Sequence, residues 1–71
     1  MLIGKIMTNS KRRLMVTIED QKGAKVVDVR VYQIINDGEL SPTPEGISFV
    51  PENLNAVVEL LKDAQKKLMV E

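Results

Sequence analysis

The sequence contains no cysteine, histidine or tryptophan, and one tyrosine and one phenylalanine are its only aromatic residues. Without cysteine there is no disulfide, and without cysteine and histidine no zinc site of the usual kind can form. The same absences exclude a Ser-His-Asp triad and a Cys-His dyad. No P-loop is present, and the acidic residues do not have the spacing of an EF-hand. We therefore predict that the protein is not an enzyme and has no catalytic residue, metal or cofactor.

Long apolar segments are missing as well. No run approaches the roughly 20 residues of a membrane span, and the opening residues 1–7 are too short for a secretory signal. We expect a soluble intracellular protein without a membrane partner, folded as a single domain over residues 1–71. A core of this size rarely supplies more than about 3–5 kcal/mol without a disulfide, a metal or a second subunit. Because the first two are excluded, a homodimer is expected.

The charges are unevenly distributed along the chain. Ten basic and ten acidic residues give a formal net charge of zero, but residues 1–35 have a net charge of +4 and residues 36–71 a net charge of −4. A basic half of this kind favours a surface that faces nucleic acid.

Alternating apolar and polar residues predict strands in the first half of the chain. The alternation is loose over residues 2–7, clear over residues 14–19 and strongest over residues 25–35, which are rich in β-branched residues. Within the last segment one face is expected to carry Val27, Val29 and Val31, and the other Asp28, Arg30 and Tyr32.

Turn residues separate these strands. Residues 20–23 end in glycine, and Asn36-Asp37-Gly38-Glu39 carries the Asp-Gly signature of a hairpin. The chain should then return antiparallel from Leu40. Pro42 and Pro44 make this return irregular or confine it to an edge, and residues 46–50 are predicted to form a last short strand or a strand end.

The remaining residues have the pattern of a helix. Pro51 suits the first helical position and Glu52 the positive end of the dipole, although Val50 is a poor N-cap. An apolar stripe at helical spacing is predicted to pack against the sheet and against a partner helix; it consists of Leu54, Val57, Val58, Leu61, Ala64 and Leu68. Strands followed by one amphipathic C-terminal helix indicate an α+β fold with an antiparallel sheet.

Three motifs in fixed order resemble a known family. D-V-R-V-Y begins at Asp28, D-G-E-L-S-P at Asp37, and G-I-S at Gly46. Together they resemble the transcriptional coactivator positive cofactor four family over residues 14–68, with one inserted residue near Ala24. The resemblance implies a four-stranded antiparallel sheet followed by a helix, and a dimer built around the helices. It also implies binding of single-stranded DNA, or unwound duplex, in transcription, replication or repair.

The resemblance also implies which residues bind nucleic acid. Lys22, Lys25 and Arg30 match basic positions that contact the nucleic-acid backbone in the family, where cations neutralise phosphates. Further basic residues are predicted to support them: Lys5 and the run Lys11, Arg12 and Arg13, which lies where this chain is longer than the family pattern. Arg30 has an alternative interpretation, because it can pair with the neighbouring Asp28 on the sheet face.

Several positions depart from the family pattern. Gln21 and Gln33 stand where the family often has aromatic residues, and Ser41 and Glu45 stand where it has lysines. Base stacking on such aromatic rings contributes about 1–3 kcal/mol per base. The alternative is therefore a dimeric protein-interaction module on the same fold, with weak or lost nucleic-acid binding.

The sequence thus predicts a small homodimeric single-stranded DNA-binding protein that acts as a transcription coactivator or regulator, or in replication and repair. Unwound duplex and RNA are alternative ligands, and transcription or replication proteins are candidate partners. The expected location is the cytoplasm, in association with the nucleoid, for a prokaryotic or phage protein and the nucleus for a eukaryotic one.

Overall fold

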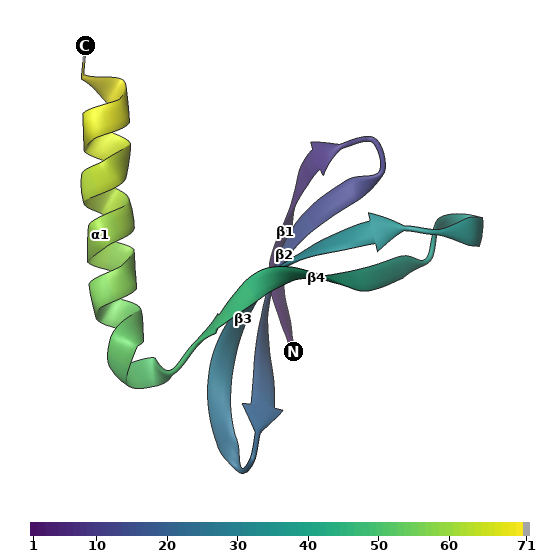
Figure 1. The fold of residues 1–71 in the computed structure, drawn as a ribbon, viewed down its shortest axis with the longest axis horizontal. Helices are drawn as coiled ribbons and strands as arrows, with labels where there is room; N and C mark the ends of the chain where they lie inside the picture. The colour runs from purple at the N-terminus through teal and green to yellow at the C-terminus, as the bar shows by residue number, and fades with distance from the viewer. Residues whose placement is uncertain (71) are drawn as a thin grey trace.

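In the computed structural model, which describes residues 1–70, four antiparallel strands are followed by one helix (Figure 1). The sheet order is β1-β2-β3-β4, so each strand pairs with its neighbour in the sequence. This confirms the predicted four-stranded sheet and C-terminal helix. The elements are β1 Leu2–Asn9, β2 Arg12–Gln21, β3 Ala24–Ile34, a 3-10 turn η1 Asn36–Gly38, β4 Leu40–Phe49 and α1 Pro51–Met69.

The hairpin turns follow from their residues. Lys22 and Gly23 form the two-residue connection between β2 and β3, and both have positive φ, 51° and 82°. Such a turn matches the twist of the strands on either side of it. Asp37 and Gly38 have φ of 65° and 77° between β3 and β4. The predicted Asp-Gly hairpin is therefore confirmed.

Strand β1 is longer than the sequence predicts, and β4 is more regular. β1 continues to Asn9, whose Oδ1 accepts a hydrogen bond from the Lys11 amide at 2.8 Å and closes the turn. Of the two alternatives for residues 46–50, the end of the returning strand is the correct one, because β4 is continuous through Pro42 and Pro44 to Phe49. It tolerates both prolines because it is an edge strand, with one side free of ladder hydrogen bonds.

The register divides the sheet into two faces of different composition. Directly opposite residues share a face, and Val16, for example, lies opposite both Gly4 and Val29. The face with Val16, here called the apolar face, carries Ile6, Leu14, Val16, Ile18, Val27, Val29, Val31, Ile47 and Phe49. The other, here called the polar face, carries Lys5, Met7, Arg13, Met15, Thr17, Val26, Asp28, Arg30, Tyr32 and Ser48. The predicted alternation within residues 14–19 and 25–35 is confirmed.

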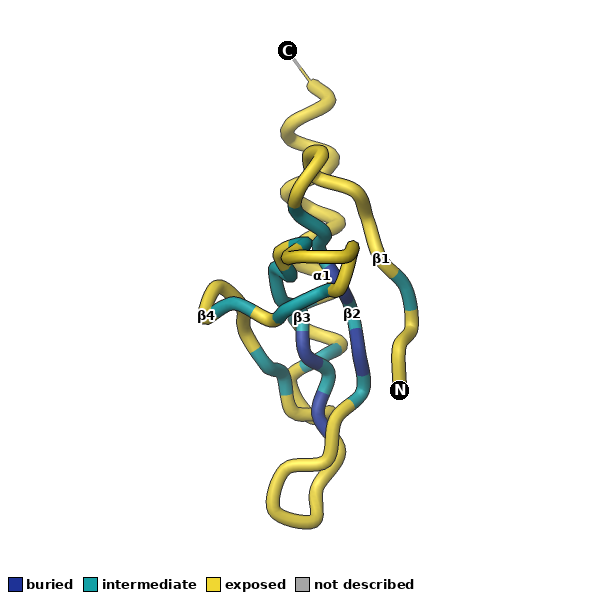
Figure 2. Tube along the Cα trace, turned by 90° about the vertical axis from the view of Figure 1, so that its right-hand side faces the viewer, coloured by how far each residue is buried: buried dark blue, intermediate teal, exposed yellow. Residues whose placement is uncertain are grey.

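The best-covered side chains lie on the polar face. Met15, Thr17, Val26 and Asp28 are the four buried residues within the described range 1–70, and they form the dark centre of the sheet in Figure 2. On the apolar face the side chains are half-buried or exposed, and Ile47 is 56% exposed. One chain therefore leaves its most hydrophobic sheet face uncovered.

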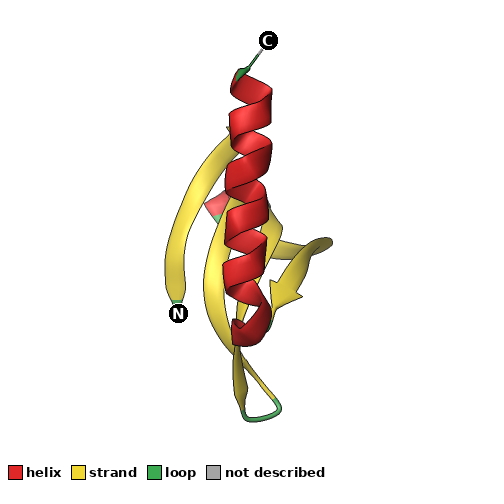
Figure 3. Cartoon of the chain, turned by 90° about the vertical axis from the view of Figure 1, so that its left-hand side faces the viewer, coloured by secondary structure: helices red, strands yellow, loops and turns green. Residues whose placement is uncertain are grey.

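The helix does not cover that face. It leads away from the end of β4 and touches the sheet chiefly at β3 (Figures 1 and 3). Of the predicted stripe only Leu54 and Val57 are half-buried, whereas Leu61 is 64% and Leu68 85% exposed. The prediction that the stripe packs against the sheet therefore holds only at the beginning of the helix.

The resulting molecule is open and flat, measuring 41 × 39 × 18 Å. Its radius of gyration is 14.2 Å, whereas a compact chain of this length is expected to have about 11 Å. Its accessible surface is 5872 Å², compared with about 4,500 Å² for a compact monomer of this mass. The helix of the described residues is not long and apolar enough to span a membrane.

Gly46 is a position where a side chain has no room. A Cβ atom there would lie 2.8 Å from the Val29 carbonyl oxygen and 2.9 Å from Cβ and Cγ of Arg30. We expect Gly46→Ala to lower the free energy of unfolding by about 1–3 kcal/mol, measured by urea denaturation at fixed protein concentration. Gly4→Ala is the control, because a Cβ there meets nothing within 4 Å. Equal stability of the two variants would contradict this account.

Candidate functional site

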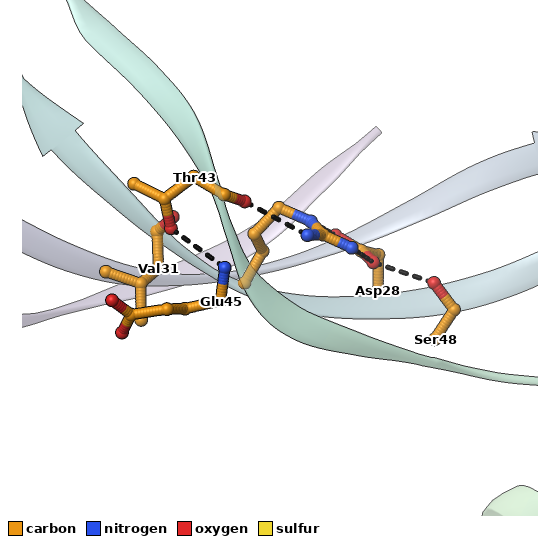
Figure 4. A network of polar contacts seen from close by, with 6 residues as sticks. Asp28, Val31, Thr43, Glu45 and Ser48 are labelled. Carbon is orange, nitrogen blue, oxygen red and sulfur yellow. Dashed lines mark hydrogen bonds and ion pairs between the residues drawn. The ribbon is translucent and has the colours of Figure 1, made fainter.

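A bidentate ion pair occupies the centre of the polar face. Arg30 Nε donates to Oδ2 of Asp28 and Arg30 Nη2 to its Oδ1, both at 3.0 Å. Ser48 Oγ donates a third hydrogen bond to the same carboxylate, at 2.7 Å (Figure 4). The Asp28 side chain is only 10% exposed, so it loses most of its water and depends on these three donors. The alternative interpretation of Arg30, a pair with Asp28, is therefore what the structure shows.

The same arginine connects β3 to the edge strand. Arg30 Nη1 donates to the Thr43 carbonyl oxygen at 3.0 Å. The Thr43 hydroxyl in turn donates to the Val31 carbonyl at 2.8 Å and accepts from the Glu45 amide at 3.2 Å (Figure 4). These contacts surround the register shift of the β3–β4 ladder. Side chains thus support the part of β4 where the regular ladder is interrupted.

The pair keeps both groups charged at neutral pH. The hydrogen bonds from Arg30 are the main cause that lowers the pKa of Asp28, with help from Ser48, while burial acts in the opposite direction. The hydrogen bond to the Asp28 carboxylate raises the pKa of Arg30. The centre of the polar face therefore holds an ion pair without net charge, and not an isolated positive charge.

Three of the seven predicted binding residues share the polar face. Lys5 lies opposite Met15, which in turn lies opposite Arg30. Arg13 lies two residues from Met15 on the same strand and opposite Tyr32. Lys5, Arg13 and Arg30 therefore lie together around Met15, close to the tyrosine.

The other four predicted residues lie elsewhere. Lys11 and Lys22 occupy the two hairpin turns at opposite ends of β2. Lys25 and Arg12 belong to the side of the apolar face, near those same ends. The structure thus does not bring Lys22 and Lys25 into one cluster with Arg30, and binding by these residues stays a prediction.

Two further ion pairs neutralise predicted cations. Arg12 Nη1 lies 3.3 Å from Oε1 of Glu45, a contact that reaches from β2 to β4. Lys25 Nζ lies 3.3 Å from Oδ1 of Asp20 within the β2–β3 hairpin. Together with the Arg30 pair, three of the seven predicted cations have a carboxylate partner. Within residues 1–70 the other four have none: Lys5, Lys11, Arg13 and Lys22.

Sequence reasoning missed the residues that complete the Asp28 site. Ser48 and Thr43 were not singled out, although Ser48 belongs to the G-I-S motif. Its role depends on the register, which places it opposite Asp28. Glu45, which stands where the family has a lysine, forms an ion pair with Arg12 in the structure.

The surface around these residues is open. Residues 1–70 form no pocket, and no group of three acidic side chains among them is placed to hold a metal ion. The arrangement offers a sheet face without a pocket, on which basic side chains surround a buried centre, and this suits an extended charged ligand more than a small molecule.

The chain is similar to proteins of one family. The family model for the transcriptional coactivator p15 (PC4) matches residues 8–60. Crystal structures of a PC4 homologue from Burkholderia pseudomallei, in orthorhombic and tetragonal forms, share 31% sequence identity with it and superpose with TM-scores of 0.87 and 0.86. These matches cover 92% of this chain, and 88% and 96% of the respective solved chains.

A phage protein shares the same fold at lower identity. It is the bacteriophage T5 homologue of the eukaryotic transcription coactivator PC4, implicated in recombination-dependent DNA replication. It is 15% identical, with a TM-score of 0.58, and the match covers 96% of this chain and 97% of that chain.

The Asp28 pair predicts a specific pH dependence of stability. Its carboxyl pKa is lower in the folded state than the ordinary value of 3.8. The pair's contribution is therefore fully present above pH 3.8 and lost as the pH falls through the lower folded-state pKa. We expect Asp28→Asn to lower the free energy of unfolding at pH 7 by about 1–3 kcal/mol, and the difference from wild type to shrink in acid.

Urea denaturation from pH 7 down to pH 3 measures this difference. Asp63→Asn is the matched control, because Asp63 is exposed on the helix and should change stability at pH 7 by no more than about 0.5 kcal/mol. A constant difference between Asp28→Asn and wild type across the whole pH range would refute the linkage.

Proposed function

This chain belongs to the PC4 family of transcriptional coactivators, and from that membership we propose that it is a homodimeric protein that binds single-stranded DNA and acts in transcription, replication or repair. The observation that carries the proposal is the polar face, on which Lys5, Arg13 and Arg30 lie close together. Residues 1–70 form no pocket there. Cations on an open sheet can follow a phosphate backbone while the bases vary, so binding is expected to be largely independent of sequence.

The surface of one chain supports the homodimer. The excess of exposed area over a compact monomer of this mass is about 1,400 Å², which exceeds the roughly 800 Å² per partner of a standard interface. The apolar face of the sheet and the helix stripe beyond Val57 are the uncovered hydrophobic regions. A second copy that covers both would complete the core that one chain lacks.

A second candidate function is the dimeric protein-interaction module. It is favoured by the three ion pairs that neutralise Arg12, Lys25 and Arg30. It is also favoured by Gln21 and Gln33, which offer no aromatic ring for base stacking. The two functions differ in one measurable property, the affinity of the folded dimer for nucleic acid at low salt.

Fluorescence anisotropy separates these functions. We expect a labelled single strand of about 20 nucleotides to bind more tightly than its duplex, with affinity falling about ten-fold or more between about 50 and 200 mM salt. Absence of binding at low salt by a correctly folded dimer would reject the proposal and favour the interaction module. An RNA strand of the same sequence, run in parallel, tests whether DNA is preferred.

A substitution in the helix stripe tests whether this stripe forms the dimer interface. Leu61 is 64% exposed within one chain, so Leu61→Glu removes little intrachain packing and is expected to act on the partner contact. Light scattering coupled to size-exclusion chromatography should give a dimer for the wild type and a monomer for Leu61→Glu. Asn55→Glu adds the same charge outside the stripe, about 120° from Leu61 around the helix, and should remain dimeric. A dimeric Leu61→Glu variant would contradict an interface built on this stripe.

A further inference from the structure

The β1–β2 hairpin is unlike the rest of the chain in charge. Residues 1–18 contain four basic residues and no acidic residue, and the first carboxylate along the chain is that of Glu19. Glu45 is the one acidic side chain from elsewhere in residues 1–70 that forms an ion pair with this segment. The basic character of the first half of the chain is therefore concentrated in a single hairpin at one edge of the sheet.

We infer that this hairpin, through Lys5, Lys11 and Arg13, is the main contact surface for the phosphates of a single nucleic-acid strand. The inference rests on the proposed function and assigns it to particular residues. It shifts the binding surface from the centre of the sheet, at Arg30, to the edge formed by β1 and β2.

The positions of these cations suit a phosphate backbone. Lys5 and Arg13 are diagonal neighbours on the polar face, and the Cα atoms of such neighbours lie roughly 7–8 Å apart. Lys11 follows in the turn at the end of the same hairpin. The Arg13 Nη1 atom donates to the carbonyl oxygens of Asn9 and Arg12 at 3.0 and 2.9 Å, so the guanidinium is held at the hairpin end without losing its charge.

The ion-paired cations are expected to contribute less. A phosphate that approaches Arg12 also approaches the Glu45 carboxylate 3.3 Å away, and the pair as a whole has no net charge. The same holds for Lys25 beside Asp20 and for Arg30 beside Asp28. Unpaired cations therefore dominate the electrostatic attraction.

Glu19 marks the end of this surface along β2. It is exposed and lies on the polar face beyond Thr17, between Arg13 and the Lys22 turn. Its carboxylate has no ion-pair partner within residues 1–70, so it repels a strand that continues in that direction. Because Glu19 lies between them, Lys22 is not part of the surface formed by Lys5, Lys11 and Arg13.

The slope of log affinity against log salt concentration measures the number of phosphate contacts, at about 0.7 for each contact with a single strand. We expect Lys11→Ala/Arg13→Ala to make the slope shallower by about 1.4 per protomer that binds.

The matched control removes a complete ion pair. Arg12→Gln/Glu45→Gln leaves the net charge of the chain unchanged and keeps two side chains of similar length, so wild-type affinity and slope are expected. Circular dichroism and light scattering on each variant establish that fold and oligomeric state are retained.

The outcomes separate the two proposals. If the wild type binds with a clear salt dependence but Lys11→Ala/Arg13→Ala keeps the wild-type slope, the assignment to the hairpin is overturned and the proposed function stands. Loss of binding in the charge-neutral control equal to that in Lys11→Ala/Arg13→Ala also overturns the assignment. If the wild type does not bind a single strand at low salt, both proposals are overturned.

Discussion

The ion pair between Asp28 and Arg30 determines how the last strand joins the sheet. Because alternate residues of a strand share a face, a carboxylate and a guanidinium two positions apart can meet in bidentate geometry. The guanidinium then reaches the Thr43 carbonyl on β4, and Ser48 reaches back to the carboxylate from the same strand. Gly46 leaves the space that the arginine stem occupies. Two prolines and a register shift weaken the ladder of β4, and this network of side chains compensates for it at the strand from which the helix departs.

The second constraint is the distribution of hydrophobic side chains. Among residues 1–70 the fully buried side chains lie on the polar face, while the valines and isoleucines of the apolar face are only half-buried or exposed and most of the helix stripe is exposed in one chain. In the proposed dimer these two uncovered regions become the core. The polar face is then left to solvent and to the proposed ligand.

Much of this architecture could be predicted from the sequence. Period-two alternation identified the central strands and assigned Val27 and Asp28 to opposite faces, because that information is local. The Asp-Gly turn and the edge position of Pro42 also follow from local backbone chemistry. The sequence left open whether residues 46–50 continue the returning strand, and the partners of Arg12, Lys25 and Ser48 were not predicted. They depend on which residues of distant strands lie opposite one another, and a one-residue change in register would exchange all of these partners.

The two register shifts in the β1–β2 ladder affect how readily other chains can pair with the free edge of β1. An unpaired edge with exposed Leu2, Ile3 and Ile6 is a template on which other chains can add strands. In β1 the register shifts between Leu2 and Gly4 and again between Met7 and Asn9, so only residues 4–7 form an uninterrupted ladder. Lys5 places a charge within that short stretch. The two register shifts and the charge of Lys5 therefore oppose the addition of strands from other chains to this edge, and with it the growth of fibril-like polymers.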